Sequence, residues 1–228
     1  MSAQNPLFPA FLKLENLRVL LVGGGNVGLE KLTAILRSSP TTAVTVVSIS
    51  FLPEVRGLAA QHLGLRLVAR AWQETDLDAA DIVFAATDDP ALHRRIKAAA
   101  RQRRLLVNVA DTPDLCDFYL SSVVQKGQLK VAISTNGKSP TVAKRLRAVL
   151  EEALPEELDE VLQQMTVIRG RLAGDFAAKV KSLNAVTAEL AGGKPYESPA
   201  TKRWRRVAAG SLLTVGALLA SRLLRRPE

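Results

Sequence analysis

The stretch LRVLLVGGGNVGLEKLTAILR, residues 17–37, decides the fold of this chain. An apolar run from Leu17 to Val22 stops at three consecutive glycines, and apolar residues then recur with helical spacing from Val27 onward. A short apolar run, a glycine turn and a 3.6-residue period are typical of a β-strand, a tight turn and an α-helix. The stretch therefore predicts a strand–turn–helix unit.

Three glycines of this turn, Gly23, Gly25 and Gly28, fit the pattern G-x-G-x-x-G of dinucleotide-binding sites. The first allows the sharp turn, the second lets the backbone approach a pyrophosphate, and the third lets the helix pack closely on the strand. The N–H groups at the helix start would hold the phosphate charge. A glycine turn without a ligand is the alternative, but its position between a strand and a helix favours nucleotide binding.

Composition and charge exclude several classes of protein. The 228 residues suffice for one large or two small domains with a core, and the single cysteine, Cys116, excludes a disulfide framework and a multi-cysteine metal site. The net charge is +9, but residues 194–228 hold eight Lys or Arg and two Glu, which leaves +3 for the rest. We therefore expect no nucleic acid as a partner. Because no charged-then-apolar leader begins the sequence, we expect a cytoplasmic protein.

Strands and helices are expected to alternate along the first half of the chain. Apolar, β-branched runs predict further strands at 43–49, 65–70, 81–86 and 105–109. Helices are predicted between them at 52–63 and 89–103, with His62 and His93 on their surfaces. This alternation predicts an α/β fold, a Rossmann-type parallel sheet with helices on both faces.

Glycine or polar residues follow three of the predicted strands, at 23–28, 86–89 and 108–111. Ligands of such sheets bind outside the carboxyl ends of the strands, so these stretches form the candidate site. Asp88 or Asp89 has an alternative role as a helix N-cap, and Asp111 has one as a turn former. The second strand ends near Ser48 with neither an acid nor an arginine, so this position does not distinguish NAD from NADP.

The pattern changes after residue 117. Apolar runs at 118–124 and 129–134 flank a short turn with Gly127 and predict a β-hairpin. A polar loop and a basic helix follow, and helical periodicity at 155–190 suits dimerisation. The expected domains are an NAD-binding Rossmann domain at 1–113, a hairpin and dimerisation region with a basic loop at 114–150, a small helical domain at 151–191, and a linker with an apolar tail at 192–228.

The apolar part of the tail, residues 207–221, carries no charge and is flanked by KRWRR and by later arginines. A membrane-spanning helix usually needs about 20 apolar residues, so this run is short unless Trp204 and the arginines extend it. We expect residues 204–226 to anchor the chain to the cytoplasmic membrane, and packing on protein is the alternative.

Four segments, VGGGNVGLEK, AATDDP, VNVADTPDLCDFYL and AISTNGKSPTVAKRLR, resemble the precorrin-2 dehydrogenase family in their order and spacing. This family also forms the N-terminal module of siroheme synthases, and its members include sirohydrochlorin ferrochelatases. The resemblance covers about residues 7–190. It implies a homodimeric oxidoreductase of tetrapyrrole (porphyrin-type) biosynthesis that oxidises precorrin-2 to sirohydrochlorin with NAD, optionally followed by Fe²⁺ insertion, a lyase step.

The resemblance also implies roles for individual residues. Asp111 is the implied catalytic residue, which suits a reaction that gives a hydride to nicotinamide and a proton to a base. The expected cofactor-binding residues are Gly23, Gly24, Gly25, Asn26, Val27, Ser48, Thr87 and Asp88. The expected substrate-binding residues are Asn108, Phe118, Ser134, Thr135, Asn136, Lys138, Ser139 and Lys144. No resident metal is expected.

Precorrin-2 is a polycarboxylate, so a basic cleft would complement its charge. The candidates are Lys126, Lys130, Lys138, Lys144 and Arg145, and a solvated surface position is the alternative for each alone. Two other residues depart from the family: Glu30 and His93 stand where it usually has arginine and asparagine.

The sequence leaves two other functions open. One is an NAD-sensing regulatory module without catalysis, which would need the glycine turn but not Asp111. The other is a carbonyl reductase, which we disfavour because its Tyr-x-x-x-Lys pair is missing: Val123 stands four residues after Tyr119, and Ala200 four after Tyr196.

Overall fold

A computed structural model describes residues 5–155, 158–171 and 176–186. They fall into two units, one built from residues 5–125 and 130–154 and the other from 126–129 and the described residues from 155 onward. Among the described helices, none is both long and apolar enough to cross a bilayer. The predicted membrane anchor at 204–226 lies outside the described residues. The predicted domain boundaries at 113, 150 and 191 stay predictions.

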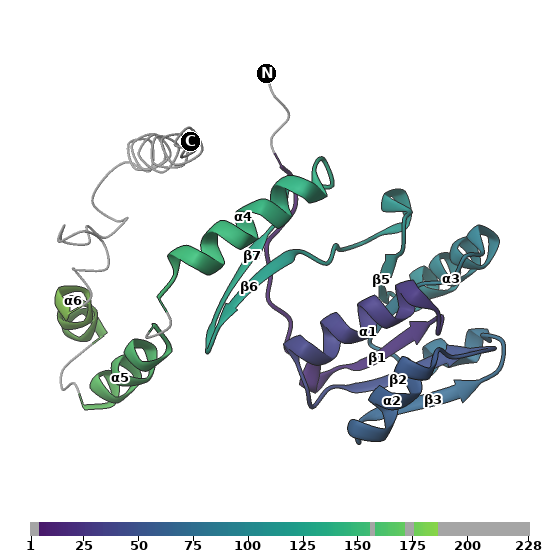
Figure 1. Ribbon diagram of the computed structural model, residues 1–228, viewed down its shortest axis with the longest axis horizontal. Helices are drawn as coiled ribbons and strands as arrows, with labels where there is room; N and C mark the ends of the chain where they lie inside the picture. The colour runs from purple at the N-terminus through teal and green to yellow at the C-terminus, as the bar shows by residue number, and fades with distance from the viewer. Residues whose placement is uncertain (1–4, 156–157, 172–175, 187–228) are drawn as a thin grey trace, which may run out of the picture. The chain divides into compact units, whose positions relative to one another are not determined.

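The first unit holds a five-stranded parallel sheet with helices on both faces (Figure 1). Its strands are β1 (Arg18–Val22), β2 (Ala43–Ser48), β3 (Leu65–Ala69), β4 (Ile82–Ala85) and β5 (Leu106–Val109). They lie in the order β3-β2-β1-β4-β5, and every neighbouring pair is parallel. The predicted Rossmann-type fold is confirmed, with strand limits within about two residues of those expected.

The crossovers between these strands are α1 (Asn26–Ser38), α2 (Pro53–Gln61) and α3 (Pro90–Gln102), with the short 3-10 helices η1 (Leu14–Asn16), η2 (Glu74–Ala79) and η3 (Pro113–Leu115). The strand order reverses between β1 and β4, because β2 and β3 lie on one side of β1 and β4 and β5 on the other. At such a reversal the following loops diverge and open a crevice at the carboxyl ends of the strands.

Two apolar layers hold the helices to the sheet. Successive side chains of a strand point to opposite faces, so β1 sends Leu21 to one layer and Leu20 to the other. Leu21 packs with Leu32 and Ile35 of α1, and Leu20 packs in the layer that contains Ile96 of α3. All five side chains are almost completely buried, which fixes α1 and α3 against the strands that carry the candidate site.

The predicted hairpin is present as β6 (Ser122–Lys126) and β7 (Leu129–Ile133), but β6 begins later than residue 118. The Phe118 carbonyl accepts a hydrogen bond from Asn108 Nδ2 at 2.8 Å, and its ring packs edge-on against Phe84 with centroids 5.4 Å apart. These contacts hold Phe118 against the first sheet, so it does not join the hairpin. The predicted basic helix follows as α4 (Pro140–Ala153).

The second unit contains α5 (Leu158–Arg171) and α6 (Phe176–Val186), which lie in the region where the sequence predicts helices. The tip of the hairpin belongs to this unit: Gly127 has a positive φ of +53°, and the Gln128 N–H donates to Asp159 Oδ1 of α5 at 2.7 Å. The hydrogen bond fixes the turn to the start of α5.

Candidate functional site

The turn after β1 is built on two very close backbone contacts. Gly23 has a φ of +118°, and a Cβ added there would lie 2.2 Å from the carbonyl oxygen of Ala86. A Cβ added at Gly28 would lie 2.2 Å from the carbonyl oxygen of Gly23. Because no side chain fits at either position, the predicted roles of Gly23 in the turn and Gly28 in close helix packing are confirmed.

Gly25 has different surroundings, since a Cβ added there would meet no atom within 4 Å. This glycine is the N-cap of α1, and no side chain caps the helix. The first N–H groups of a helix have no partner within the helix, and they attract anions. The open space over Gly25 and the donors beside it therefore fit the diphosphate of a dinucleotide. Ser48 borders the same turn, because a Cβ at Gly24 would lie 3.1 Å from Ser48 Cβ.

The loop after β4 lies beside the glycine turn, since a Cβ at Gly23 would be 3.2 Å from the nitrogen of Thr87. Asp89 caps α3: its Oδ1 accepts from the N–H groups of Leu92 at 3.1 Å and Ala91 at 2.8 Å, and these bonds lower the pKa of Asp89. The predicted cap is thus Asp89, and Asp88 is left exposed beside it.

His93 is buried, so the predicted surface position is wrong. Its side chain is 4% exposed, and its Nε2 accepts a hydrogen bond from the Thr87 N–H at 3.3 Å. Burial lowers the pKa of His93, and the charge of Asp89 opposes this shift. The helical spacing of the sequence could have indicated that His93 is buried, because His93, Ile96 and Ala100 lie on one buried face of α3.

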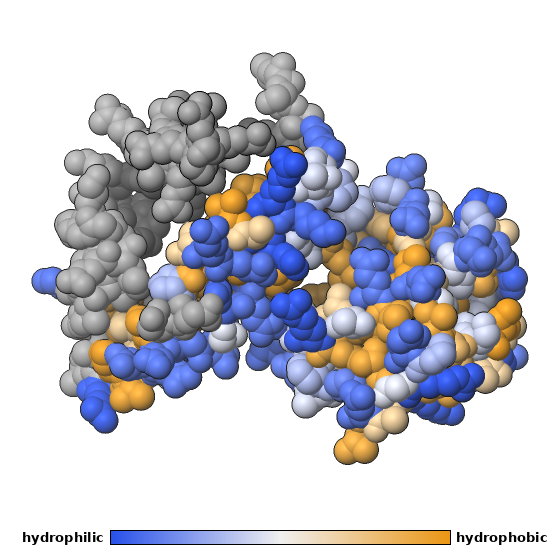
Figure 2. Space-filling view, viewed as in Figure 1, coloured by the Kyte–Doolittle hydropathy of each residue, from blue (hydrophilic) through white to orange (hydrophobic). Residues whose placement is uncertain are grey.

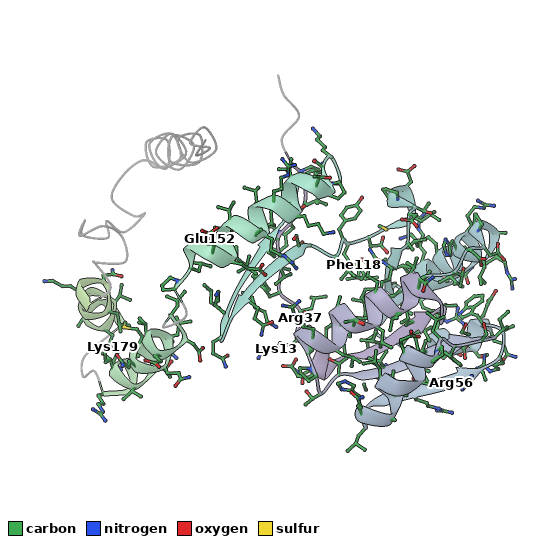
Figure 3. The ribbon with its side chains drawn as sticks, in the orientation of Figure 1. Lys13, Arg37, Arg56, Phe118, Glu152 and Lys179 are labelled. Carbon is green, nitrogen blue, oxygen red and sulfur yellow. The ribbon has the colours of Figure 1, made fainter. Side chains whose placement is uncertain are left out.

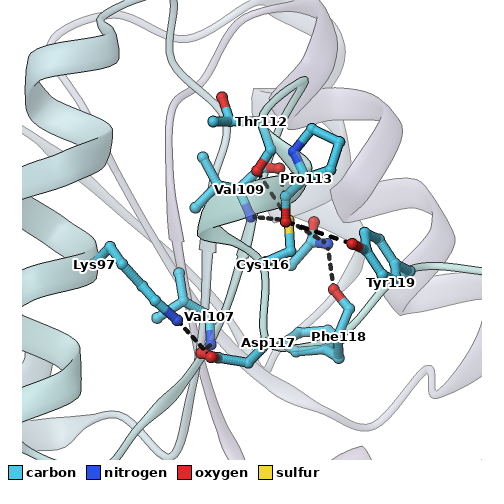
Figure 4. Close-up of polar contacts among 10 residues, drawn as sticks. Lys97, Val107, Val109, Thr112, Pro113, Cys116, Asp117, Phe118 and Tyr119 are labelled. Carbon is cyan, nitrogen blue, oxygen red and sulfur yellow. Dashed lines mark hydrogen bonds and ion pairs between the residues drawn. The ribbon is translucent and has the colours of Figure 1, made fainter. Parts of the chain in front are cut away.

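Residues 116–118 return along β5 and cover its free edge (Figure 4). The Asp117 N–H donates to Val107 O at 2.8 Å, and the Asp117 carboxylate accepts from the Val107 N–H at 2.9 Å and from Lys97. The Cys116 thiol accepts from the Val109 N–H at 3.2 Å and donates to Val109 O at 3.1 Å. The turn at residues 110–115 is therefore held at both ends.

Asp111 lies in this turn with a φ of +53° and an exposed side chain. A left-handed backbone is uncommon for a residue other than glycine, although aspartate tolerates it better than most, and such conformations gather at functional sites. Within the described part of the chain, the Asp111 carboxylate forms no hydrogen bond and no ion pair. It is available to a ligand at the end of β5.

Lys31 is a site residue that the sequence did not indicate. Its ammonium donates to Asn108 Oδ1 at 2.7 Å from the middle of α1. Burial lowers the pKa of Lys31, whereas the nearby Cys116, Glu30 and Asp111 act in the opposite direction. Asn108 is 4% exposed and also donates to the Phe118 carbonyl, so one buried amide joins α1, β5 and the segment before β6.

A groove of about 1110 Å³ opens beside Asp111 within the first unit. Its walls are α1, the turn after β5, residues 119–125, the end of β7 and the start of α4. Figure 2 shows hydrophilic side chains around the hollow between the sheet and the α4 part of this unit.

Some of the expected substrate-binding residues line this groove, namely Asn108, Ser134, Thr135 and Lys144. The others have different surroundings. Phe118 packs on Phe84, Ser139 caps α4 by accepting from the Val142 N–H at 3.2 Å, and Asn136 and Lys138 lie in the compact turn before α4. The groove thus gathers half of the expected set.

Two family models match the chain. The model for a putative NAD(P)-binding domain matches residues 10–122, and the model for the sirohaem biosynthesis protein central domain matches residues 126–153. They meet near the start of the hairpin.

The chain is also similar to curated siroheme synthases. It is 36% identical over 178 residues to the one from Psychrobacter arcticus, covering 77% of this chain and 31% of that protein. It is 36% identical over 173 residues to the one from Methylococcus capsulatus, covering 76% of this chain and 34% of that protein. The chain therefore spans about a third of the length of these relatives.

Among solved structures, the chain is similar to SirC, a precorrin-2 dehydrogenase, with a TM-score of 0.66 and 26% sequence identity. The similarity covers 79% of this chain and 89% of that one. It therefore includes nearly the whole of that structure.

We expect Gly25→Ala to fold normally but to bind NAD⁺ about tenfold more weakly, because the added methyl group has room in the free protein yet occupies the space of a diphosphate. Calorimetric titration with NAD⁺ measures the affinity. Gly57→Ala in α2 is the matched control, since a Cβ there also meets no atom within 4 Å. Equal affinity in the two variants would contradict the assignment.

The free energy of unfolding should depend on pH through His93. Because the folded pKa is lowered, protonation of the unfolded chain destabilises the fold as pH drops below the ordinary pKa of 6.5. The stabilisation by neutral His93 is complete above pH 6.5 and is lost as the pH falls toward the lowered pKa of the folded state. Over this range the free energy of unfolding changes by at most about 1.4 kcal/mol per pH unit. His93→Asn should flatten the slope in urea unfolding measured between about pH 7.5 and 5.

The control for this experiment is His62→Asn. His62 is half-buried at the C-terminal end of α2, and its replacement should leave the pH dependence of the free energy of unfolding as in the wild type. Asparagine at position 93 offers an amide oxygen to the Thr87 N–H, so the loop should keep its hydrogen bond. A slope unchanged by His93→Asn would show that another group causes the acid sensitivity.

Proposed function

The chain belongs to the precorrin-2 dehydrogenase family, and we propose that it oxidises precorrin-2 to sirohydrochlorin with NAD⁺ as the hydride acceptor. The observation that carries this proposal is the position of Asp111, which follows β5, lines the groove and has no described protein partner. Its charge acts both on His93 beneath the loop after β4 and on Lys31 in the groove. A base at this position would serve a cofactor and a substrate that meet at the strand ends.

The residues at the carboxyl ends of β1, β2 and β4 suit the proposed cofactor. Backbone N–H groups of Gly24, Gly25, Asn26 and Val27 would hold the diphosphate at the start of α1. Ser48 would lie toward the adenosine ribose, as the last residue of β2. Thr87 and Asp88, after β4, would lie on the side of the nicotinamide half.

The proposed reaction moves two electrons and two protons from the substrate. NAD⁺, when bound, would be the oxidant that accepts the hydride, which leaves one proton to be removed. The Asp111 carboxylate accepts this proton as a general base. The turn held by Cys116 and Asp117 keeps the carboxylate at the strand end, so little rearrangement is required when the substrate binds.

Iron insertion is a second proposed step, supported by the family resemblance. Insertion of Fe²⁺ releases two pyrrole protons, and the same carboxylate at the rim of the groove would accept them one after the other, releasing the first to water before it takes the second. Fe²⁺ is then a substrate of the protein. Dehydrogenation and iron insertion would then take place with the macrocycle bound in the same position.

We expect Asp111→Asn to bind NAD⁺ with wild-type affinity and to oxidise precorrin-2 at least about 100-fold more slowly, because an amide cannot accept the proton. Anaerobic turnover followed by NADH and sirohydrochlorin absorbance measures the rate, and Fe²⁺ added afterwards tests insertion. Asp114→Asn is the control, since this exposed carboxylate in η3 does not line the groove.

Wild-type turnover in Asp111→Asn would refute the proposed base. NAD⁺ binding by the wild type without any turnover would instead favour the alternative, a regulatory module that senses NAD. Sirohydrochlorin formation without iron insertion would restrict the activity to the first step.

The proposed assembly is a homodimer that uses α4. Val142, Leu146 and Val149 are 47%, 37% and 39% exposed, and their spacing puts them in one line along the helix. An exposed apolar stripe of this kind is typical of an interface with another protein. A second copy of the chain is the proposed partner.

Light scattering after size exclusion should give a dimer mass for the wild type and a monomer mass for the triple serine variant of Val142, Leu146 and Val149, because serine removes the apolar contact area. Leu63→Ser is the control, since Leu63 is fully exposed and lies outside α4. A monomeric wild type, or a dimeric triple variant, would contradict the proposed interface.

A further inference from the structure

Four cationic side chains on two helices border the groove beside Asp111. Lys31 and Arg37 belong to α1, and Lys144 and Arg147 belong to α4. The carboxylates of Glu30 and Asp111 also line the groove, so its walls carry an excess of positive charge. A groove with this balance favours an anionic ligand.

Among the described residues, three of these cations form no ion pair with a carboxylate, and the fourth, Arg147, forms a long one. Within the described part of the chain, no carboxylate lies within ion-pair distance of Lys31, Arg37 or Lys144. The Arg147 Nε lies 3.6 Å from Glu151 Oε1, which is too long for a hydrogen bond, so this buried Nε has no hydrogen-bond acceptor within the described part of the chain. The Arg147 side chain is 36% exposed and lines the groove, so the other N–H groups of its guanidinium can donate to a ligand.

The basic residues expected from the sequence differ from this set. Lys144 lines the groove, whereas the Lys130 ammonium donates to the backbone carbonyl of Ser38 at 2.7 Å. Arg145 is exposed on α4 and does not line the groove. Arg37 lies on α1, at the end of the helix nearer the hairpin in Figure 3. The positive charge of the groove thus comes from α1 as well as from α4.

We propose that Lys31, Arg37, Lys144 and Arg147 form an anion clamp that binds the acidic side chains of the tetrapyrrole from two walls and orients the ring beside Asp111. The identity of the ligand rests on the proposed function, but the clamp itself requires only a multiply carboxylated macrocycle. Guanidinium groups bind carboxylates through paired hydrogen bonds, and ammonium groups act as point charges. Contacts from two sides fix both the position and the rotation of a flat ring.

Lys31 has a second role in the clamp, because its hydrogen bond to Asn108 sets the position of its charge. One N–H of the ammonium is used by Asn108 Oδ1, and two remain for a ligand. Partial burial of Lys31 weakens competition from water, so a carboxylate at this position gains more than one at an exposed lysine.

The clamp is tested by direct binding of uroporphyrin, an octacarboxylate macrocycle, so the result does not depend on turnover. Fluorescence titration should give dissociation constants about tenfold higher for Arg37→Gln and for Arg147→Gln than for the wild type. Their dependence on salt concentration should also be weaker, because each variant loses one charge contact. Arg145→Gln removes the same charge from α4 outside the groove and should bind as the wild type does.

NAD⁺ affinity should be unchanged in all three variants, and their thermal unfolding temperatures should match that of the wild type. A second probe, the tetracarboxylate coproporphyrin, should bind the wild type more weakly than uroporphyrin, and the two clamp variants should reduce this difference. Equal uroporphyrin affinity in Arg37→Gln, Arg147→Gln and Arg145→Gln overturns the clamp.

The clamp and the proposed function fail in different ways. Tight uroporphyrin binding that depends on Arg37 and Arg147, without oxidation of precorrin-2, refutes the proposed function and supports the clamp. Oxidation of precorrin-2 with an unchanged KM in both clamp variants supports the function and refutes the clamp.

Discussion

The contact between Gly23 and Ala86 determines where the other parts of the site lie. The backbone of the turn after β1 lies so close to the loop after β4 that even a methyl group at Gly23 would be 2.2 Å from the Ala86 oxygen. Gly28 then brings α1 directly over the same turn. Because α1 carries Lys31 to Asn108, the glycine turn also fixes the end of β5. One backbone contact thus connects all three strand ends.

The two sides of the site differ in how they are held. The cofactor side depends on backbone geometry and on the neutral His93, whose Nε2 accepts a hydrogen bond from the Thr87 N–H. The Asp111 side depends on side chains: Cys116 and Asp117 attach the turn to β5, and Asn108 connects it to α1. This difference suits the proposed roles, since a diphosphate would be bound by N–H groups, whereas a proton acceptor needs a carboxylate in a fixed position.

The sequence predicted what depends on local pattern. Strand and helix periodicity predicted the five-stranded sheet, and the glycine spacing predicted the contacts at Gly23 and Gly28. It did not predict contacts between distant residues: Lys31 and Asn108 are 77 positions apart, and the start of β6 depends on the contact of Phe118 with Phe84. His93 was misjudged because a polar residue was assigned to solvent although its helical face is buried.

In the proposed complex, one rim of the sheet holds the nucleotide over the glycine turn, with the nicotinamide beside Asp111. A crystal structure of the complex with NAD⁺ tests this arrangement. We predict diphosphate oxygens within about 3 Å of the N–H groups of Gly25 and Asn26, and the nicotinamide ring on the side of the loop after β5. A diphosphate bound away from the start of α1, or a nicotinamide directed away from Asp111, would contradict the proposed arrangement.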